Sequence, residues 1–146
     1  MQYFEDFAVG QKFATGSRHV DAAEIVEFAA KYDPQPFHLD AEAAKDSVFG
    51  GLAASGWHSA AMMMRLIVDS EFRPAGGILG FGGELAWLKP VRPGDELRVE
   101  SEIIELRESR SRPTQGVVKV HLTMRNQHGE AVQTFTPTLL VNRRPT

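Results

Sequence analysis

Residues 57–72 read WHSAAMMMRLIVDSEF, and apolar side chains occupy nearly every face of the helix that they would form. Eight of the nine residues from 60 to 68 are apolar, and Arg65 is the exception. A helix that is hydrophobic on most faces belongs in the interior of a protein. Flexible methionine side chains are typical core filler, which is a commoner use than a soft metal site. We therefore expect this helix to be covered by other elements.

After Pro74 the apolar residues recur with a period of two, which indicates strands. The predicted strands are 78–88, 96–106, 117–125 and 130–141. The third alternates between an apolar set (Val118, Val120, Leu122, Met124) and a polar set (Lys119, His121, Thr123, Arg125). Turn sequences, RPGD at 92–95 and NQHG at 126–129, separate the strands. The simplest packing wraps an antiparallel sheet around the apolar helix, an α+β arrangement.

The part of the chain before this helix predicts one strand and two short helices. Residues 12–20 are a plausible strand, weakened by Gly16. Asp21 then has the character of an N-cap with Glu24 three residues later, which is a capping-box pattern. The helix that follows has one apolar stripe, formed by Ile25, Phe28, Ala29 and Tyr32. A second helix is expected at 40–45, followed by a loop at 48–51.

Between these helices, residues 33–38 read DPQPFH. Each proline fixes its own φ and disfavours helical geometry at the residue before it, so the first helix should end at Asp33. Asp33 and His38 would lie roughly 16 Å apart in a fully extended chain, so only a bend could bring them to one water molecule. With that bend the pair has the composition of an acid/base site. Without it, the segment is a helix-ending turn with a solvated Asp and a surface His, and spacing alone leaves both interpretations open.

The motifs DPQPFHLD at 33–40 and AASGWH at 53–58, taken with the order of elements, resemble a known family. The chain is similar to the MaoC-like dehydratases, or (R)-specific enoyl-CoA hydratases, whose signature runs Asp, any residue, Asn, Pro, an aliphatic residue, His. The second motif resembles the stretch that opens the central helix of that family. The likeness extends from residues 7–10 to the last strand. It implies a single hotdog domain over residues 1–146, with an antiparallel sheet wrapped around a long central helix.

The resemblance implies that Asp33 and His38 activate the water that adds to the β-carbon of a 2-enoyl thioester. Negative charge then develops on the carbonyl oxygen, and donors aimed at that oxygen lower the barrier. The matching glycine supplies such a donor in the family, so the backbone N–H of Gly56 is our candidate. The start of a helix, with unpaired N–H groups, favours an anion independently. We expect the substrate to be contacted by neighbours in the two motifs: Gln35, Phe37, Ser55, Trp57 and His58. His58 could instead have a structural partner at the start of the helix.

Three residues depart from the family pattern. Gln35 replaces the usual Asn, and Ser55 replaces a frequent His. Met64 stands where some members carry a serine that orients the site. Without a serine at position 64, the sequence does not show which residue would orient the Asp33–His38 pair.

Composition limits the partners and the compartment. The 146 residues contain no cysteine, which excludes disulfides and thiolate chemistry and fits a cytoplasmic protein. The net charge of −3 predicts no general attraction to nucleic acid or to a membrane surface. No metal or redox cofactor is expected, because the histidines are scattered and addition of water is redox-neutral. Coenzyme A would enter only as part of an acyl-CoA substrate. The family resemblance implies a homodimer, or an assembly of dimers, joined edge to edge through the sheets.

Two rival functions stay open from the sequence. A hotdog thioesterase could use Asp33 to direct water at the thioester carbonyl, and a non-catalytic acyl-CoA-binding module could keep the fold alone. The basic cluster Arg107–Arg112 could grip the phosphates of coenzyme A, since arginine binds phosphate in a bidentate manner. A solvated hairpin loop is the alternative explanation for this cluster.

Overall fold

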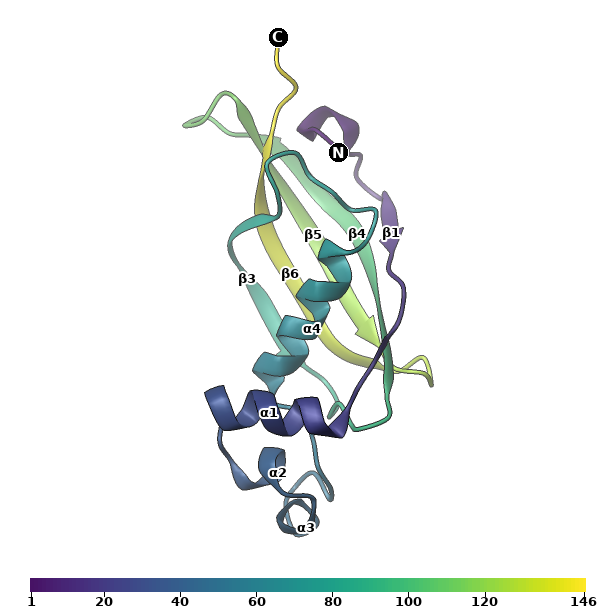
Figure 1. Ribbon diagram of the computed structural model, residues 1–146. Helices are drawn as coiled ribbons and strands as arrows, with labels where there is room; N and C mark the ends of the chain where they lie inside the picture. Colours follow the sequence, from purple (N-terminus) through teal and green to yellow (C-terminus); the bar gives the residue numbers. More distant parts are fainter.

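The computed structural model describes residues 1–146 and contains one curved antiparallel sheet (Figure 1). Its order is β1–β4–β5–β6–β3, and the two-residue β2 also pairs with β4. The strands are β1 (Lys12–Ala14), β2 (Arg18–His19), β3 (Leu79–Trp87), β4 (Glu96–Glu108), β5 (Gln115–Arg125) and β6 (Ala131–Asn142). Strand β3 pairs only with β6, so one edge of β3 is free of backbone partners in this chain.

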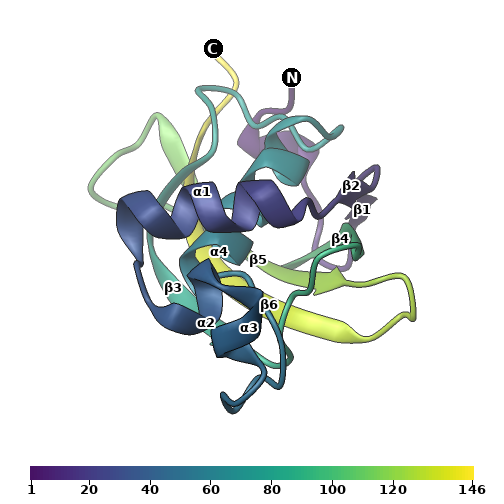
Figure 2. The same cartoon turned by 60° about the horizontal axis from the view of Figure 1, so that its bottom comes forward.

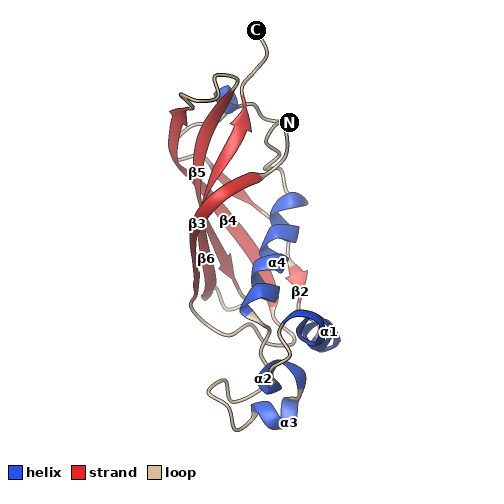
Figure 3. Cartoon of the chain, turned by 90° about the vertical axis from the view of Figure 1, so that its left-hand side faces the viewer, coloured by secondary structure: helices blue, strands red, loops and turns tan.

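Helix α4 (Gly56–Val68) lies along the concave face of the sheet, which gives the molecule two layers (Figure 3). The predicted apolar set of β5 faces this helix, and all four of its members are buried. They pack with Met62, Met63, Leu66 and Ile67 from α4 in one hydrophobic cluster. The predicted α+β class, with an antiparallel sheet wrapped around the apolar helix, is therefore confirmed.

One stripe of α4 is not covered by the sheet. Trp57, Ala61, Met64 and Val68 recur at helical spacing, and all are exposed. Leu79 and Phe81 of the edge strand β3 are 56% and 60% exposed. An apolar face of this kind on a chain is typical of a protein–protein interface.

Three further helices gather at one end of the molecule, beyond the start of α4 (Figure 2). They are α1 (Ala22–Tyr32), α2 (Pro36–Leu39) and α3 (Ala41–Ala44). Asp21 caps α1 as predicted, since its carboxylate accepts the Ala23 N–H at 3.0 Å. The predicted capping box is wrong, because Glu24 binds Arg18 (2.7 Å) and His58 (3.2 Å) instead of its own helix end.

The structure corrects two predicted boundaries and adds one helix. The first strand is interrupted around Gly16, where β1 ends and β2 begins. Helix α4 ends at Val68 instead of Phe72, because the Ser70 hydroxyl donates to Ile67 O (2.6 Å) and turns the chain. Phe72 then enters the core at 5.6 Å from the ring of Phe7. Helix α2 was not predicted, since it is a single turn that begins on a proline at its first position.

The two ends of the chain meet at the opposite end of the molecule from α1–α3 (Figure 1). The short 3₁₀ turn η1 (Phe4–Asp6) lies there against the last residues, with Glu5 accepting from Arg143 Nε at 3.2 Å. No helix of the chain has the length and hydrophobicity needed to cross a bilayer.

Candidate active site

The segment between α1 and α2 folds back on itself, as an acid/base pair would require. Asp33 ends α1 in a non-helical conformation (φ −153°, ψ 64°), and the Gln35 N–H donates to the Asp33 carbonyl at 2.8 Å. Pro36 then starts α2, which carries His38 back toward Asp33. His38 Nε2 lies 3.4 Å from Asp33 Oδ2. The alternative of a surface histidine is wrong, since only 5% of His38 is exposed.

A backbone contact fixes the tautomer of His38. Its Nδ1 lies 2.6 Å from the carbonyl oxygen of Ala53, which can only accept, so Nδ1 carries a proton. In the neutral ring Nε2 is therefore unprotonated and faces Asp33. The rings of Phe37 and Phe49 pack against His38, with centroids at 4.6 and 6.0 Å. The pair thus presents two acceptors, one carboxylate oxygen and one ring nitrogen, side by side.

The carboxylate of Asp33 is itself held by two donors. Gln35 Nε2 donates to Oδ1 at 2.5 Å, and the Ser55 hydroxyl donates to Oδ2 at 2.7 Å. Burial acts to raise the pKa of Asp33, but these two hydrogen bonds and the nearby His38 outweigh it and lower the pKa below its usual value. Asp33 is therefore ionised at neutral pH.

Next to this pair lies the first turn of α4. Ser55 is its N-cap and accepts the Trp57 N–H at 3.3 Å. The first N–H groups of a helix have no partner within the helix, and Gly56 is the first residue of α4. Trp87 covers Gly56, because the indole Nε1 donates to Gly56 O at 2.9 Å and a Cβ on Gly56 would lie 2.4 Å from the ring.

These groups surround one cavity of about 340 Å³. Its lining combines the Asp33–His38 pair (the dyad), the start of α4 and the segment after β3. The lining residues are Asp33, His38, Phe49, Ala54, Gly56, Trp57, Ser59, Trp87, Leu88, Lys89, Pro90 and Val91. An anionic carboxylate, a ring nitrogen and a helix N-terminus around a partly apolar cavity can bind water beside an ester-like carbonyl. That is the composition of a site for acid/base chemistry on an acyl group.

The family model described as a MaoC like domain matches residues 6–126. The chain belongs to the MaoC-like family.

Solved and curated relatives place this MaoC-like chain among hotdog proteins. A MaoC-like dehydratase from Rhodospirillum rubrum superposes with a TM-score of 0.97 and 51% identity, covering 100% of both chains. The protein YdeM of Bacillus subtilis is 33% identical over 124 residues, which are 84% of this chain and 86% of YdeM. The (R)-specific enoyl-CoA hydratase of Aeromonas caviae is 34% identical over 107 residues, 73% of this chain and 78% of the enzyme. The fold is the hotdog fold, as the sequence motifs implied.

The MaoC-like motifs contribute to the cavity unevenly. Of the residues predicted to contact substrate, only Trp57 lines it. The amide of Gln35 and the hydroxyl of Ser55 are bound to Asp33, while Phe37 packs on the ring of His38. His58 is buried between α1 and α4, stacked on Phe28 at 4.7 Å. His58 thus has the structural partner that the sequence left open, and its placement as a substrate contact gains no support from the geometry.

Sequence reasoning missed the opposite wall of the cavity. Trp87 and residues 88–91 come from the end of β3, about thirty residues after the AASGWH motif. Only the pairing of β3 with β6 brings them over the start of α4. No local spacing signals such a contact, although a tryptophan at the end of a predicted strand is a natural candidate for a cavity wall.

A second cavity, of about 330 Å³, lies between the later turns of α4 and the sheet. Its lining is almost entirely apolar: Met64, Ile67, Phe72, Ile78, Gly80, Gly82, Gly83, Val120, Leu122, Phe135, Pro137 and Leu139. The backbone of Gly83 touches β6 so closely that a Cβ would lie 2.8 Å from Pro137 Cα. The glycines of β3 thus bring the edge strand close to β6 beside this cavity.

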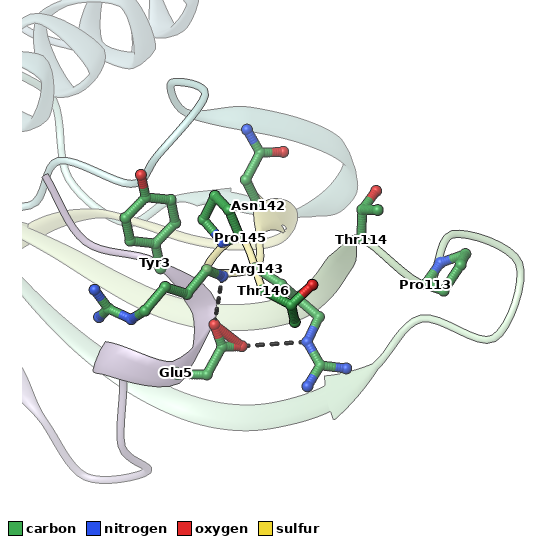
Figure 4. A pocket seen from close by; sticks show the side chains of 9 residues that line it. Tyr3, Glu5, Pro113, Thr114, Asn142, Arg143, Pro145 and Thr146 are labelled. Atoms are coloured by element: carbon green, nitrogen blue, oxygen red, sulfur yellow. Dashed lines mark hydrogen bonds and ion pairs between the residues drawn. The ribbon is translucent and has the colours of Figure 1, made fainter.

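A larger hollow of about 1090 Å³ opens where the chain ends meet (Figure 4). Its charged groups already pair with one another, since Glu5 binds both Arg143 Nε and the Arg144 N–H. It also lies at the far end of the molecule from α1 and α2, the helices on either side of Asp33 (Figure 1). The basic cluster Arg107–Arg112 is at this same end, joined to it through the bond from Arg143 N–H to Thr114 O. Within one chain, neither feature reaches the dyad.

Proposed function

We propose that residues 1–146 act as one MaoC-like domain that adds water reversibly to a 2-enoyl-CoA, giving a 3-hydroxyacyl thioester. The observation that carries the proposal is the pair of acceptors, Asp33 Oδ2 and His38 Nε2, 3.4 Å apart in a cavity that also holds the start of α4. The similarity to an (R)-specific enoyl-CoA hydratase supports the same reaction class.

In this proposal one water molecule donates a hydrogen bond to each acceptor. Asp33 is held ionised and orients the water, while His38 Nε2 takes its proton as the oxygen bonds to the β-carbon. The electron pair of the double bond moves toward the thioester carbonyl, and the α-carbon then receives the proton. In the reverse direction the same groups return a proton to the leaving hydroxide. The reaction is redox-neutral and uses no cofactor beyond the coenzyme A of the substrate.

The Gly56 N–H is the proposed donor to the enolate oxygen. It stands at the N-terminus of a 13-residue helix, where the positive end of the helix dipole favours an anion. Trp87 holds the carbonyl side of the same residue through its indole N–H. This carbonyl belongs to the peptide unit after the one that bears the N–H, so the hydrogen bond from Trp87 holds Gly56 in place on the side away from the donor.

The apolar cavity is the proposed site of the acyl tail. Met64 lines it eight residues after Gly56, which is about 12 Å along the helix axis at 1.5 Å per residue. A thioester carbonyl at Gly56 would thus direct an acyl chain along α4 toward an apolar end. This arrangement favours a hydrocarbon acyl group over a short polar one.

A second copy of the chain is the proposed partner, joined through β3. The free edge of β3 can extend the sheet, and the exposed stripe of α4 lies on the same side. Burial of that stripe explains why the sequence of α4 is apolar on nearly all faces: one part contacts its own sheet and another part a neighbour.

Two variants test the assigned dyad. Asp33→Asn and His38→Gln keep the side-chain shapes, and each should lower kcat for hydration of a 2-enoyl-CoA by about 10²-fold or more. The assay follows the loss of conjugated-enoyl absorbance, with thermal melting to show that the variants fold. His121→Gln is the matched control, because His121 binds Thr136 (2.8 Å) on the other face of the sheet. Wild-type rates in both dyad variants would refute the assignment.

The same assay separates the rival functions. A thiol-reactive dye should detect no coenzyme A released while the enoyl absorbance falls. Prompt thiol release would identify a thioesterase, and binding of acyl-CoA without either change would identify a non-catalytic module.

A further inference from the structure

We propose that Ser55 is a positioning residue, which fixes the Asp33 carboxylate and connects it to the first turn of α4. The inference rests on the proposed function, and it gives Ser55 a role in holding the dyad in place of the substrate contact that its motif suggested.

The two hydrogen bonds of Ser55 determine the direction in which its hydroxyl proton points. The Trp57 N–H donates to Oγ at 3.3 Å, so Oγ acts there as an acceptor, and its single proton points to Asp33 Oδ2 at 2.7 Å. Ser55 is 0% exposed, so water cannot replace this donor. The helix N-terminus, the hydroxyl and the carboxylate therefore form one continuous chain of hydrogen bonds.

Gln35 holds the other oxygen of the Asp33 carboxylate. It donates to Oδ1 at 2.5 Å, so donors on both oxygens prevent the carboxylate from rotating. The oxygen that Ser55 holds, Oδ2, is the one that faces His38. Rotation of the carboxylate would carry this oxygen away from Nε2, so the contact from Ser55 sets the geometry of the dyad.

The contact from Ser55 shows how the Asp33–His38 pair is held although Met64 replaces the serine that orients the site in some family members. A thioether at that position cannot act as a hydrogen-bond donor, and Met64 faces the apolar cavity instead of Asp33. Support for the carboxylate comes from the residue before Gly56, not from the later turn of α4. The two departures from the family pattern thus have one explanation: Ser55 supplies the donor to Asp33, and Met64 lines the apolar cavity.

Loss of the hydroxyl should also change the titration of Asp33. Two other titratable groups line the cavity: His38 opposite the carboxylate, and Lys89, which is paired with Glu130. On α1, Glu24 is paired with Arg18 and His58. Ser55 is not a partner in any of these pairs. Since donors to a carboxylate stabilise its ionised form, removing one raises the pKa of Asp33, and a direct titration of this carboxyl group measures the change.

The test compares Ser55→Gly, Ser55→Ala and Ser55→Thr in full pH–rate profiles. Glycine is tolerated at an N-cap, so Ser55→Gly removes the donor to Asp33 with little loss of helix stability. We expect Ser55→Gly and Ser55→Ala to lower kcat by roughly 10²-fold with KM little changed, and to raise the pKa of Asp33. Ser55→Thr should restore both values toward the wild type. Ser70→Ala, which removes a buried hydroxyl at the far end of α4, should change neither.

An NMR titration of the Asp33 carboxyl carbon gives a readout that does not depend on activity. A raised Asp33 pKa in Ser55→Gly, in a protein that hydrates no 2-enoyl-CoA, would support the contact and refute the proposed function. An unchanged pKa and an unchanged kcat in Ser55→Gly would overturn the role of Ser55 while leaving the hydratase intact. Equal losses in Ser55→Thr and Ser55→Ala would likewise overturn it.

Discussion

At the scale of single residues, Gly56 meets two separate demands. In the proposed mechanism its N–H must stay open toward the cavity, and in the structure its α-carbon lies directly under the indole of Trp87. No residue with a side chain satisfies the second demand while Trp87 keeps its hydrogen bond to Gly56 O. The glycine in the AASGWH motif is therefore explained by a partner 31 residues away.

Gly56→Ala should consequently destabilise the protein by about 1–3 kcal/mol, because the new methyl group displaces the indole ring. In a Trp87→Ala background the same substitution should have little effect, since the ring that it meets is gone. Urea unfolding of the two single variants and the double variant measures this coupling. An equal loss of stability in both backgrounds would show that the ring does not constrain Gly56.

Single residues also show how far the sequence could predict the site. The approach of Asp33 and His38 was predictable from the family motif. The two prolines alone predicted only the end of the helix and left both interpretations open. The hydrogen bonds from Gln35 and Ser55 to the Asp33 carboxylate were not predictable. Ser55 is 22 residues from Asp33 in sequence, and the packing of α1, α2 and α3 brings the two side chains together. Trp87 was not predictable either, because strand pairing alone brings it to Gly56.

At the scale of elements, a buried histidine joins α1 to α4 through a hydrogen bond to Glu24. His58 Nε2 contacts Glu24, whose pKa is lowered first by the hydrogen bond from Arg18 and then by that from His58, against the effect of burial. Burial lowers the pKa of His58, although Glu24 opposes this change. The neutral form of His58 is thus the one that suits the contact between the two helices.

A stability profile against pH should show this effect. The folded pKa of His58 lies below the unfolded value of 6.5, so the unfolded chain binds more protons in that interval. Stability therefore falls as the pH drops below about 6.5. His58→Gln cannot titrate and should lose less in Tm between pH 7.5 and pH 5.5 than the wild type. Parallel Tm profiles for the two proteins would contradict this assignment.

Element boundaries were predicted well where the pattern was long and poorly where tertiary contacts set the end. The period-two pattern located β4, β5 and β6 because each strand has one face on the core. The end of α4 was missed because Ser70 and Phe72 are turned by the core, not by a local stop signal. The capping-box pattern at Asp21 was misleading because Glu24 binds Arg18 and His58 instead of the N–H groups of its own helix end.

At the scale of the whole molecule, the unpaired edge of β3 is the proposed surface of self-association. We expect Phe81→Lys to abolish self-association, because a charge on an exposed edge strand opposes pairing with another strand. Sedimentation at micromolar concentration should show a dimer for the wild type and a monomer for this variant. Ile104→Lys is the control, since Ile104 is 38% exposed on β4, away from that edge. Dimers in both variants would mean that another surface joins the copies.

The chain has two tryptophans, and they meet edge to face at 5.2 Å on the wall of the dyad cavity. All indole emission of this protein therefore originates beside Asp33 and His38, and none comes from the remote core or from the chain ends. The native polypeptide carries its own optical probe of the place where the proposed reaction occurs, with no label attached.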